Sequence, residues 1–338
     1  MNDLLVSLLR GHDLDPDGAH RFVDELVAGT LSEPVLAGVL VALEAKGVVG
    51  TDLRFLVDAL LRHARPFPGS RPVCLDTCGT GGDASHTFNI STASALVLAT
   101  MDIPVIKHGN RSVSSRCGSA DVLEAAGVAL DVDPAEARRT FEATGFVYLH
   151  APIHHPGLGR AREVRTQLQI RTVFNRLGPL LNPARPTCQV VGVFHPSALR
   201  PMAEALAPAT ERALVVHGAG TDELAVHGPT RGYLVDRGRL EPFACHPGEL
   251  GLGLEDLRDL QITGPAESLE RLRALLRGRG RRADRSAVAL NAGAAAWIWG
   301  RARNLAEGVQ RVQDMLDTDA PARTLARLAA RVEEVAHV

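Results

Sequence analysis

The spacing of apolar residues changes near residue 70, and this change limits the possible folds more than any other feature of the chain. Before Pro66 the apolar positions recur at helical spacing, whereas after Val73 short apolar runs of strand length alternate with helical segments. Such alternation predicts a parallel or mixed sheet with helices on both faces. The sequence therefore predicts an α/β protein, with a small all-helical N-terminal domain before a larger α/β domain built on a mixed or parallel central sheet.

Three helices are expected before Pro66. The first follows the cap Asp15, the second runs from Ser32 to Lys46, and the third is capped by Thr51. The proline-rich and glycine-rich connector that follows marks the end of this helical region.

Short apolar runs in the second region are expected to be strands: Val73–Leu75, Val105–Ile106, Phe146–Leu149, Gln189–Phe194 and Ala213–Val216. We expect a helical domain over residues 1–66 and an α/β domain over residues 72–338. A central helical insertion near residues 160–185 is expected to pack on the first domain rather than on the sheet.

The composition excludes several classes of protein. A formal net charge of -2 leaves no basic excess for binding nucleic acid or an anionic membrane. No apolar run approaches the roughly 18 residues of a membrane helix, and no basic, apolar leader opens the chain. The five cysteines are scattered without a CxxC pair, which indicates neither a zinc site nor a disulfide framework. We therefore expect a cytoplasmic protein.

Lysine is nearly absent from the chain. Of 37 basic residues only Lys46 and Lys107 are lysine, and the rest are arginine. Genomic base composition explains the skew as a whole, but it does not explain why lysine persists at two positions. Lys46 ends a predicted helix just before Gly47, whereas Lys107 stands in a polar segment described below.

The densest chemical signal is the segment Asp76–Asp83, of sequence DTCGTGGD. Three glycines directly after a strand let backbone N–H groups approach an anion closely, as in a phosphate-binding nest. A Walker loop needs Gly-Lys-Ser/Thr, and no lysine occurs here. Gly79–Ala84 also matches the loose dinucleotide pattern, with Asp102 near the expected ribose-binding distance, but helical spacing starts only near Thr92. A phosphate-binding loop is favoured over a dinucleotide site or a plain glycine turn.

Two further segments carry groups suited to an anion. Asn89–Ser94 places several hydroxyls and free amides at a helix start, where the helix dipole favours negative charge, whereas a plain cap would need only one hydroxyl. Lys107–Asp121 combines cations with four serines before a helix and could wrap a polyphosphate. A solvated surface loop is the alternative for this last segment.

Together these segments resemble the anthranilate phosphoribosyltransferases. The matching motifs are GTGGD at Gly79–Asp83, NIST at Asn89–Thr92, KHGNR at Lys107–Arg111 and GSAD at Gly118–Asp121. The resemblance continues through His150–Pro156, Val164–Arg165, Arg171–Pro183, Val216–Gly218, Asp222–Glu223 and Leu290–Ala292, and so covers nearly the whole chain in order.

The resemblance implies transfer of the phosphoribosyl group of phosphoribosyl pyrophosphate (PRPP) to the amine of anthranilate, in tryptophan biosynthesis. It also implies the fold shared with pyrimidine nucleoside phosphorylases, Mg²⁺ as cofactor with up to two ions per active site, and a homodimer formed through the helical domain. The expected partners are these small-molecule substrates, with no nucleic acid and no membrane.

Site residues are implied position by position. PRPP would be held by Gly79, Gly82, Asp83, Thr87, Asn89, Ile90, Ser91, Thr92, Lys107, His108, Gly109, Asn110, Arg111, Ser112, Val113, Ser114, Ser115 and Ser119. Anthranilate would be held by Gly79, His108, Asn110, His155, Arg165, Gly178 and Pro179. Mg²⁺ would be held by Ser91, Asp222 and Glu223, directly or through water.

Catalysis is assigned to Asp83, Lys107 and Arg165, the last because its fork fits the carboxylate of anthranilate. His108 or His155 is a candidate to take the proton from the anthranilate amine. Once this nitrogen is bonded to the ribose carbon it loses its proton easily, so no strong base is needed. Without the resemblance, Arg165 could equally be an arginine on the surface of a helix.

Some positions depart from the family pattern. Gly157-Leu158-Gly159 stands where Ala-Met-Lys is usual, His86 replaces an asparagine and Thr221 replaces a hydrophobic residue. The first departure lies beside the acceptor pocket, so the acceptor's identity stays open. The alternatives are a phosphoribosyltransferase for another aromatic acceptor, a nucleoside phosphorylase, or a PRPP sensor without turnover. The motifs and the intact acceptor arginine argue against the last two.

Overall fold

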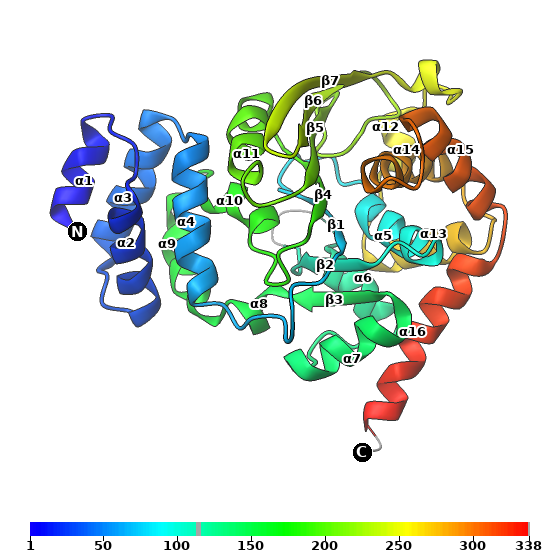
Figure 1. The fold of residues 1–338 in the computed structure, drawn as a ribbon, viewed down its shortest axis with the longest axis horizontal. Coiled ribbons are helices and arrows are strands. Elements are labelled where there is room, and N and C mark those ends of the chain that lie inside the picture. Colours follow the sequence, from blue (N-terminus) through cyan, green and yellow to red (C-terminus); the bar gives the residue numbers. More distant parts are fainter. Residues whose placement is uncertain (113–115, 337–338) are drawn as a thin grey trace.

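The computed structural model describes residues 1–112 and 116–336, and it has a small helical lobe beside a larger α/β body (Figure 1). The lobe consists of α1 (Asn2–Leu9), α2 (Pro16–Ala28), α3 (Glu33–Lys46) and α4 (Gly50–Arg62).

Local sequence explains where two of these helices begin. Asp15 caps α2 as predicted, because its Oδ1 accepts a hydrogen bond from the N–H of Gly18 at 2.6 Å. The predicted cap at Thr51 is wrong, since Val49 stands at the cap position of α4. The N–H of Val49 donates instead to Oδ2 of Asp52 at 3.0 Å. A side chain in the first turn of the helix thus accepts the hydrogen bond of the cap residue's N–H group.

Within the described residues, seven strands form one mixed sheet in the order β3-β2-β1-β4-β5-β6-β7. The strands are β1 (Leu75–Gly79), β2 (Val105–Gly109), β3 (Phe146–His150), β4 (Cys188–Gly192), β5 (Arg212–Gly218), β6 (Thr230–Asp236) and β7 (Arg239–Cys245). The pairs among β1 to β5 are parallel, and the pairs β5–β6 and β6–β7 are antiparallel. The mixed sheet and the helical lobe confirm the predicted fold class.

Strand positions follow only partly from the sequence. The expected strand at Val73–Leu75 lies too early, because β1 begins at Leu75 and continues to Gly79. Strands β6 and β7 are not predicted at all, since β7 is largely exposed and Pro242 interrupts its pattern. Their connection is the two-residue turn Arg237-Gly238, in which both residues have positive φ, as the twist of a tight hairpin requires.

The helices of the body are α5 (Ile90–Thr100), α6 (Ser119–Ala125), α7 (Pro134–Thr144), α11 (Leu199–Leu206), α12 (Leu257–Leu260), α13 (Pro265–Leu276), α14 (Arg282–Trp299), α15 (Leu305–Leu316) and α16 (Ala320–Ala336). Short 3-10 turns lie at Pro196–Ala198 and Pro247–Leu250. Helices α5 and α14 pack together in the core on one face of the sheet. Because α14 is buried on nearly all sides, its small apolar residues surround the whole helix rather than forming a stripe.

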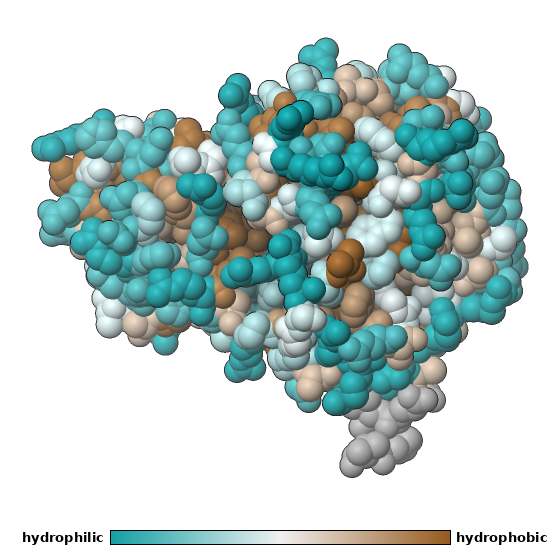
Figure 2. Space-filling view, in the orientation of Figure 1, coloured by the Kyte–Doolittle hydropathy of each residue, from teal (hydrophilic) through white to brown (hydrophobic). Residues whose placement is uncertain are grey.

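The other face of the sheet shares its core with the lobe. Val191 of β4 and Val215 of β5 belong to the same buried cluster as Phe22, Leu40 and Leu56 of the lobe helices. Figure 2 shows hydrophilic side chains over much of one face of the molecule, with hydrophobic ones gathered where the lobe meets the body. Within residues 1–112 and 116–336, no helix has both the length and the apolar character to cross a membrane.

A run of short helices lies between β3 and β4: α8 (Ala151–His154), the 3-10 helix Pro156–Ala161, α9 (Arg162–Leu168), α10 (Phe174–Leu177) and the 3-10 turn Gly178–Leu180. Val164 and Val173 are buried in the core shared with the lobe. Nη1 of Arg176 lies 2.5 Å from Oε1 of Glu44 on α3. This segment therefore contacts the lobe helices and leads back to the sheet.

Candidate active site

The glycine-rich loop follows β1 at the carboxyl edge of the parallel strands, where open α/β sheets bind their ligands. Gly79 is the last residue of β1, and α5 does not start until Ile90. Gly81 and Gly82 have φ of +65° and +76°, in the left-handed region that glycine enters without strain. The loop thus has the backbone freedom expected of an anion-binding nest.

Asp222 is bonded to this loop from a distant part of the chain. Its Oδ2 accepts the N–H of Gly81 at 2.7 Å, and its own N–H donates to Oδ2 of Asp83 at 3.2 Å. A Cβ atom at Gly79 would collide with the Asp222 carboxylate, so a larger residue there would displace the carboxylate from its present position. The structure therefore brings Gly79, Asp83 and Asp222 together, although Asp222 lies far along the chain.

Glu223 adds a third carboxylate beside Asp83 and Asp222. Burial, and then the neighbouring Asp83, raises the pKa of Asp222 to about 7. Burial and the charge of Asp222 likewise raise the pKa of Glu223, while Lys107 and the backbone of Ser91 lower it. Negative charge concentrated in this way favours a bound cation.

The carboxylates suit a Mg²⁺ ion that takes its other ligands from water and from phosphate oxygens. Among the residues that the structure describes, no three His, Cys, Asp or Glu side chains converge to hold a metal by themselves. Magnesium usually keeps several waters and binds through one or two carboxylates plus phosphate oxygens. The arrangement of Asp222 and Glu223 matches that habit.

Lys107 lies in strand β2. The expectation that the polar loop begins at Lys107 is therefore wrong. The side chain is buried, with 2% of the residue exposed. Its Nζ donates to the carbonyl of Thr77 in β1 and to Oγ of Ser91 at 3.2 Å. The ammonium group therefore lies between the strand that leads into the glycine loop and the first turn of α5, close to Glu223.

The start of α5 brings together Asn89, Ser91 and Thr92. Oδ1 of Asn89 accepts from Oγ of Ser268 at 2.7 Å, and its Nδ2 donates to the carbonyl of Cys117 at 3.3 Å. Oγ1 of Thr92 is buried and has no hydrogen-bond partner in the part of the chain that the structure describes. The side chain of Ile90 belongs to the hydrophobic core, so only its backbone could face a ligand at this helix start.

Thr87 lies in the loop between β1 and α5, where it forms an isolated bridge with Gln261. The loop is therefore held at this point by a segment from beyond β7. Thr87 lies shortly before the first turn of α5, so the bridge also holds the chain where it enters this helix.

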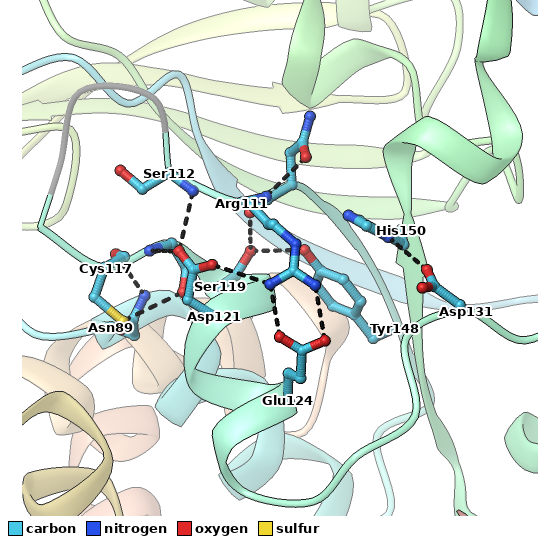
Figure 3. A network of polar contacts seen from close by, with 12 residues as sticks. Asn89, Arg111, Ser112, Cys117, Ser119, Asp121, Glu124, Asp131, Tyr148 and His150 are labelled. Carbon is cyan, nitrogen blue, oxygen red and sulfur yellow. Dashed lines mark hydrogen bonds and ion pairs between the residues drawn. The ribbon is translucent and has the colours of Figure 1, made fainter. Parts of the chain in front are cut away.

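The segment after β2 is held against α6 by acidic side chains (Figure 3). Oδ2 of Asp121 accepts the N–H groups of Ser112 at 3.1 Å and Gly118 at 2.8 Å. The guanidinium of Arg111 makes two hydrogen bonds to Glu124, at 2.6 and 2.7 Å. In this arrangement the guanidinium of Arg111 is paired with acidic side chains of α6. The expected PRPP contacts Val113, Ser114 and Ser115 lie outside the described residues.

Ser119 stands at the first position of α6, close to the end of β2. Its Oγ is 2.9 Å from the hydroxyl of Tyr148 and donates to the carbonyl of Asn110 at 3.4 Å (Figure 3). A Cβ atom at Gly109 would lie 2.5 Å from Oγ of Ser119 on α6 and 2.7 Å from the Tyr148 hydroxyl on β3, so the end of β2 closely approaches both elements. Gly109, Asn110 and Ser119 are thus close neighbours.

The expected acceptor residues His108 and His155 meet on the other side of β2. Their ring centroids are 5.3 Å apart in an edge-on arrangement. Nε2 of His155 lies 2.7 Å from the carbonyl of Leu181 and therefore donates to it. Burial lowers the pKa of His155 to about 4 and also lowers that of His108, so both rings are neutral near pH 7. The backbone of Gly178, next to Pro179, contacts His108.

Arg165 projects from α9 and is half-buried. Its guanidinium carbon lies 5.4 Å from the ring centroid of Phe174, and burial lowers its pKa. No ion pair of the described residues includes Arg165, in contrast to many arginines of this chain. A partly desolvated guanidinium without an acidic partner is suited to binding a carboxylate.

Sequence reasoning missed Asp76 and Arg171. Asp76 is fully buried in β1, where its Oδ2 accepts from Nδ2 of Asn182 at 2.9 Å, and burial raises its pKa to about 6. Arg171 donates through Nη2 to the carbonyl of Gly82. Asp76 is the first residue of the glycine-rich segment, and Arg171 is the first residue of the block that ends at Pro183. Both therefore lie within the motifs, but no spacing or composition marks them as site residues.

Comparisons with known proteins agree with this geometry. Residues 71–321 match the α/β domain model of the glycosyl transferase family, and residues 2–64 match the helical bundle domain model of that family. The chain is 42% identical to the anthranilate phosphoribosyltransferase of Sorangium cellulosum, over 98% of this chain and 95% of the relative.

Solved structures show the same relationship. The crystal structure of anthranilate phosphoribosyltransferase from Thermus thermophilus is 40% identical, with a TM-score of 0.91 over 97% of this chain and 98% of that one. The Saccharomyces cerevisiae enzyme in complex with PRPP and Mg is 24% identical and shares the fold, with a TM-score of 0.88 over 99% of each chain. These matches confirm the resemblance, and the chain belongs to the anthranilate phosphoribosyltransferase family.

Proposed function

We propose that this protein transfers the phosphoribosyl group of PRPP to the amine of anthranilate, which gives N-(5-phosphoribosyl)anthranilate and pyrophosphate in tryptophan biosynthesis. The names of its relatives support this activity. Within the molecule, the proposal is carried by the meeting of a glycine loop, a buried lysine and a carboxylate cluster around β1 and β2. The expected acceptor residues His108 and His155 lie next to them.

PRPP would bind along the glycine loop and the first turn of α5. The amides of Gly82 and Asp83 in the loop and those at the start of α5 suit its phosphate oxygens, since the N–H groups of Thr80 and Gly81 are bonded to Gly192 and Asp222. Lys107 supplies a compact positive charge next to this helix start. The bond between ribose C1 and pyrophosphate breaks while positive charge develops on the sugar ring, so the protein contributes mainly alignment and stabilisation of the leaving group.

Mg²⁺ would accompany PRPP at Ser91, Asp222 and Glu223, with up to two ions per active site. The carboxylate cluster of Asp83, Asp222 and Glu223 supports this assignment, because burial and mutual repulsion raise the pKa values of Asp222 and Glu223. When bound, the ion neutralises charge on the leaving pyrophosphate without a proton transfer.

Anthranilate would bind in the pocket beside β2. Arg165 would hold its carboxylate, and Gly79, His108, Asn110, His155, Gly178 and Pro179 would surround the ring. The amine attacks ribose C1 as pyrophosphate leaves, and the new C–N bond makes the nitrogen acidic. Neutral His108 has an Nε2 that is buried without a hydrogen-bond partner among the described residues, so it is available to accept a hydrogen bond or that proton.

Organisation beyond the active site is part of the proposal. We propose domains over residues 1–66 and 72–338, with residues 160–185 packed on the first. The exposed apolar side chains of Val6, Leu9 and Val41 on the lobe support a homodimer formed there. The five cysteines carry no disulfide bond, which suits a reducing, cytoplasmic location.

The test is to mix the protein with PRPP, Mg²⁺ and anthranilate and to follow the loss of anthranilate fluorescence. We expect turnover that needs all three components. The meta and para isomers of aminobenzoate serve as competing acceptors, because their carboxylate and amine cannot be placed in the same way. Faster use of one of these isomers would favour another acceptor, and no release of pyrophosphate with any of them would contradict the activity.

A further inference from the structure

Arg171 touches the glycine loop without belonging to the predicted site. Its Nη2 donates to the carbonyl oxygen of Gly82. Its guanidinium carbon also lies 4.0 Å from the ring centroid of Phe194, close enough for stacking. Arg171 lies in the link between α9, which carries Arg165, and α10. It therefore connects the acceptor side of the site to the loop expected to bind PRPP.

Phe194 is a fixed support for this arginine, because its backbone is bonded to the same loop. The N–H of Phe194 donates to Oγ1 of Thr80 at 2.9 Å. The N–H of Thr80 in turn donates to the carbonyl of Gly192 at the end of β4 at 3.0 Å. These hydrogen bonds fix the backbone of Phe194 relative to the glycine loop, and the Arg171 guanidinium contacts both the Phe194 ring and the loop.

The contact with Gly82 sets the orientation of one peptide group. The carbonyl of Gly82 and the N–H of Asp83 belong to the same planar unit and point in opposite directions. Gly81 and Gly82 have left-handed φ values and no Cβ, so backbone sterics restrict the rotation of this unit only weakly. On the other side, Asp222 holds the N–H of Gly81 at 2.7 Å.

We propose that Arg171 is a positioning residue that fixes the Gly82–Asp83 peptide so that the loop amides are ready for the pyrophosphate of PRPP. This inference rests on the proposed function, because it takes PRPP as the ligand of the loop. Arg171 acts through Gly82 and does not itself contact the reacting atoms. Its planar group matters because it must stack and donate at the same time.

The experiment compares Arg171→Ala and Arg171→Lys with the wild type in steady-state kinetics. Arg200→Ala is the matched control, since Arg200 is an exposed arginine paired with Glu204 on α11. We expect Arg171→Ala to raise the KM for PRPP about tenfold, with the KM for anthranilate within about twofold of wild type. Arg171→Lys keeps a donor but loses the stack, and we expect an intermediate KM for PRPP.

A second measurement does not depend on turnover. Hydrogen exchange of peptides covering residues 79–88, in protein without ligands, should be faster in Arg171→Ala than in wild type and in the control. Unchanged exchange, an unchanged KM for PRPP, or equal increases in both KM values would each overturn the inference. If the wild type does not use PRPP and anthranilate, the proposed function fails, whereas the exchange result still decides whether Arg171 holds the loop.

Discussion

Nζ of Lys46 lies 2.5 Å from Oδ2 of Asp52, and only 3% of the lysine side chain and none of the aspartate side chain is exposed. Asp13 accepts from the same ammonium at 2.9 Å, and Oδ1 of Asp52 accepts the N–H of Leu14 at 2.8 Å. Burial lowers the pKa of Lys46, but hydrogen bonds to Asp52 and Asp13 outweigh it and raise the pKa overall. The lysine that the sequence placed at an ordinary helix end therefore ties three segments of the lobe together.

Asp52→Asn should lower the free energy of unfolding by about 3 kcal/mol, because it leaves a buried ammonium without its main partner. Urea denaturation followed by circular dichroism would measure the change. Asp24→Asn is the control, since Asp24 pairs with His63 at a half-exposed position. Equal stability of the two variants would contradict a structural role for the buried pair.

Arg165→Ala should raise the KM for anthranilate by about 10²-fold and the KM for PRPP much less. The half-buried guanidinium has no acidic partner among the described ion pairs, so its free fork is the expected carboxylate site. Initial rates with each substrate varied in turn would separate the two constants. Equal effects on both would remove Arg165 from the acceptor pocket.

Asp222→Asn combined with Glu223→Gln should lower kcat/KM by about 10²-fold or more, since charge stabilisation of the leaving group is lost. Rates measured over a range of Mg²⁺ concentrations would test the metal assignment. We expect the variant to need far more Mg²⁺ for half-maximal rate. The same Mg²⁺ dependence as the wild type would show that these carboxylates do not hold the ion.

Lys107→Arg should impair the use of PRPP, because a broad guanidinium cannot replace the buried ammonium between Thr77 and Ser91. We expect the KM for PRPP to rise at least about tenfold. Lys46→Arg is the control, as it changes the other buried lysine, within the lobe. It should lose stability while its KM values stay unchanged, and a similar KM increase in both variants would refute the specific role of Lys107.

Stability should fall as the pH drops from about 6.5 to 4, in part because of His155. Burial lowers the pKa of this ring to about 4, so as the pH falls the unfolded chain binds a proton at His155 before the folded protein does. This proton binding lowers the free energy of the unfolded state relative to the folded state. A shift of about 2.5 units corresponds to up to ~3 kcal/mol, fully lost only below pH 4. His155→Gln should flatten the curve of unfolding free energy against pH, whereas His12→Gln, at an exposed position, should not.

The sequence identified groups that lie in consecutive positions with a shared chemistry. The glycine loop, the start of α5 and the pair Asp222–Glu223 carry recognisable residue types, and the structure brings them to one edge of the sheet. Pairings across the chain carry no such signal. The contact of Arg171 with Gly82 and the hydrogen bond of Asp76 with Asn182 depend on how β1 and the segment before β4 meet.

The departure at Gly157 also has an explanation that only the structure provides. A Cβ atom at Gly157 would lie 2.9 Å from both methyl carbons of Val27 on α2, so the usual alanine would require Val27 or its helix to shift. Packing against the lobe accounts for a glycine at this position. Thr221 is buried, and its Oγ1 donates to the carbonyl of Gly218 at 2.8 Å, a hydrogen bond that a hydrophobic residue could not make. His86 has a φ of +55°, in the left-handed region where asparagine and histidine are both enriched.

The burial of both lysines has a consequence for the covalent chemistry of the whole chain. Reagents that acylate amines need an accessible, unprotonated amino group, and neither Lys46 nor Lys107 offers one in the folded protein. The native protein should therefore resist side-chain acylation almost completely, while the unfolded chain should take two acyl groups at lysine. Mass spectrometry after a short pulse of such a reagent would then count unfolded molecules directly.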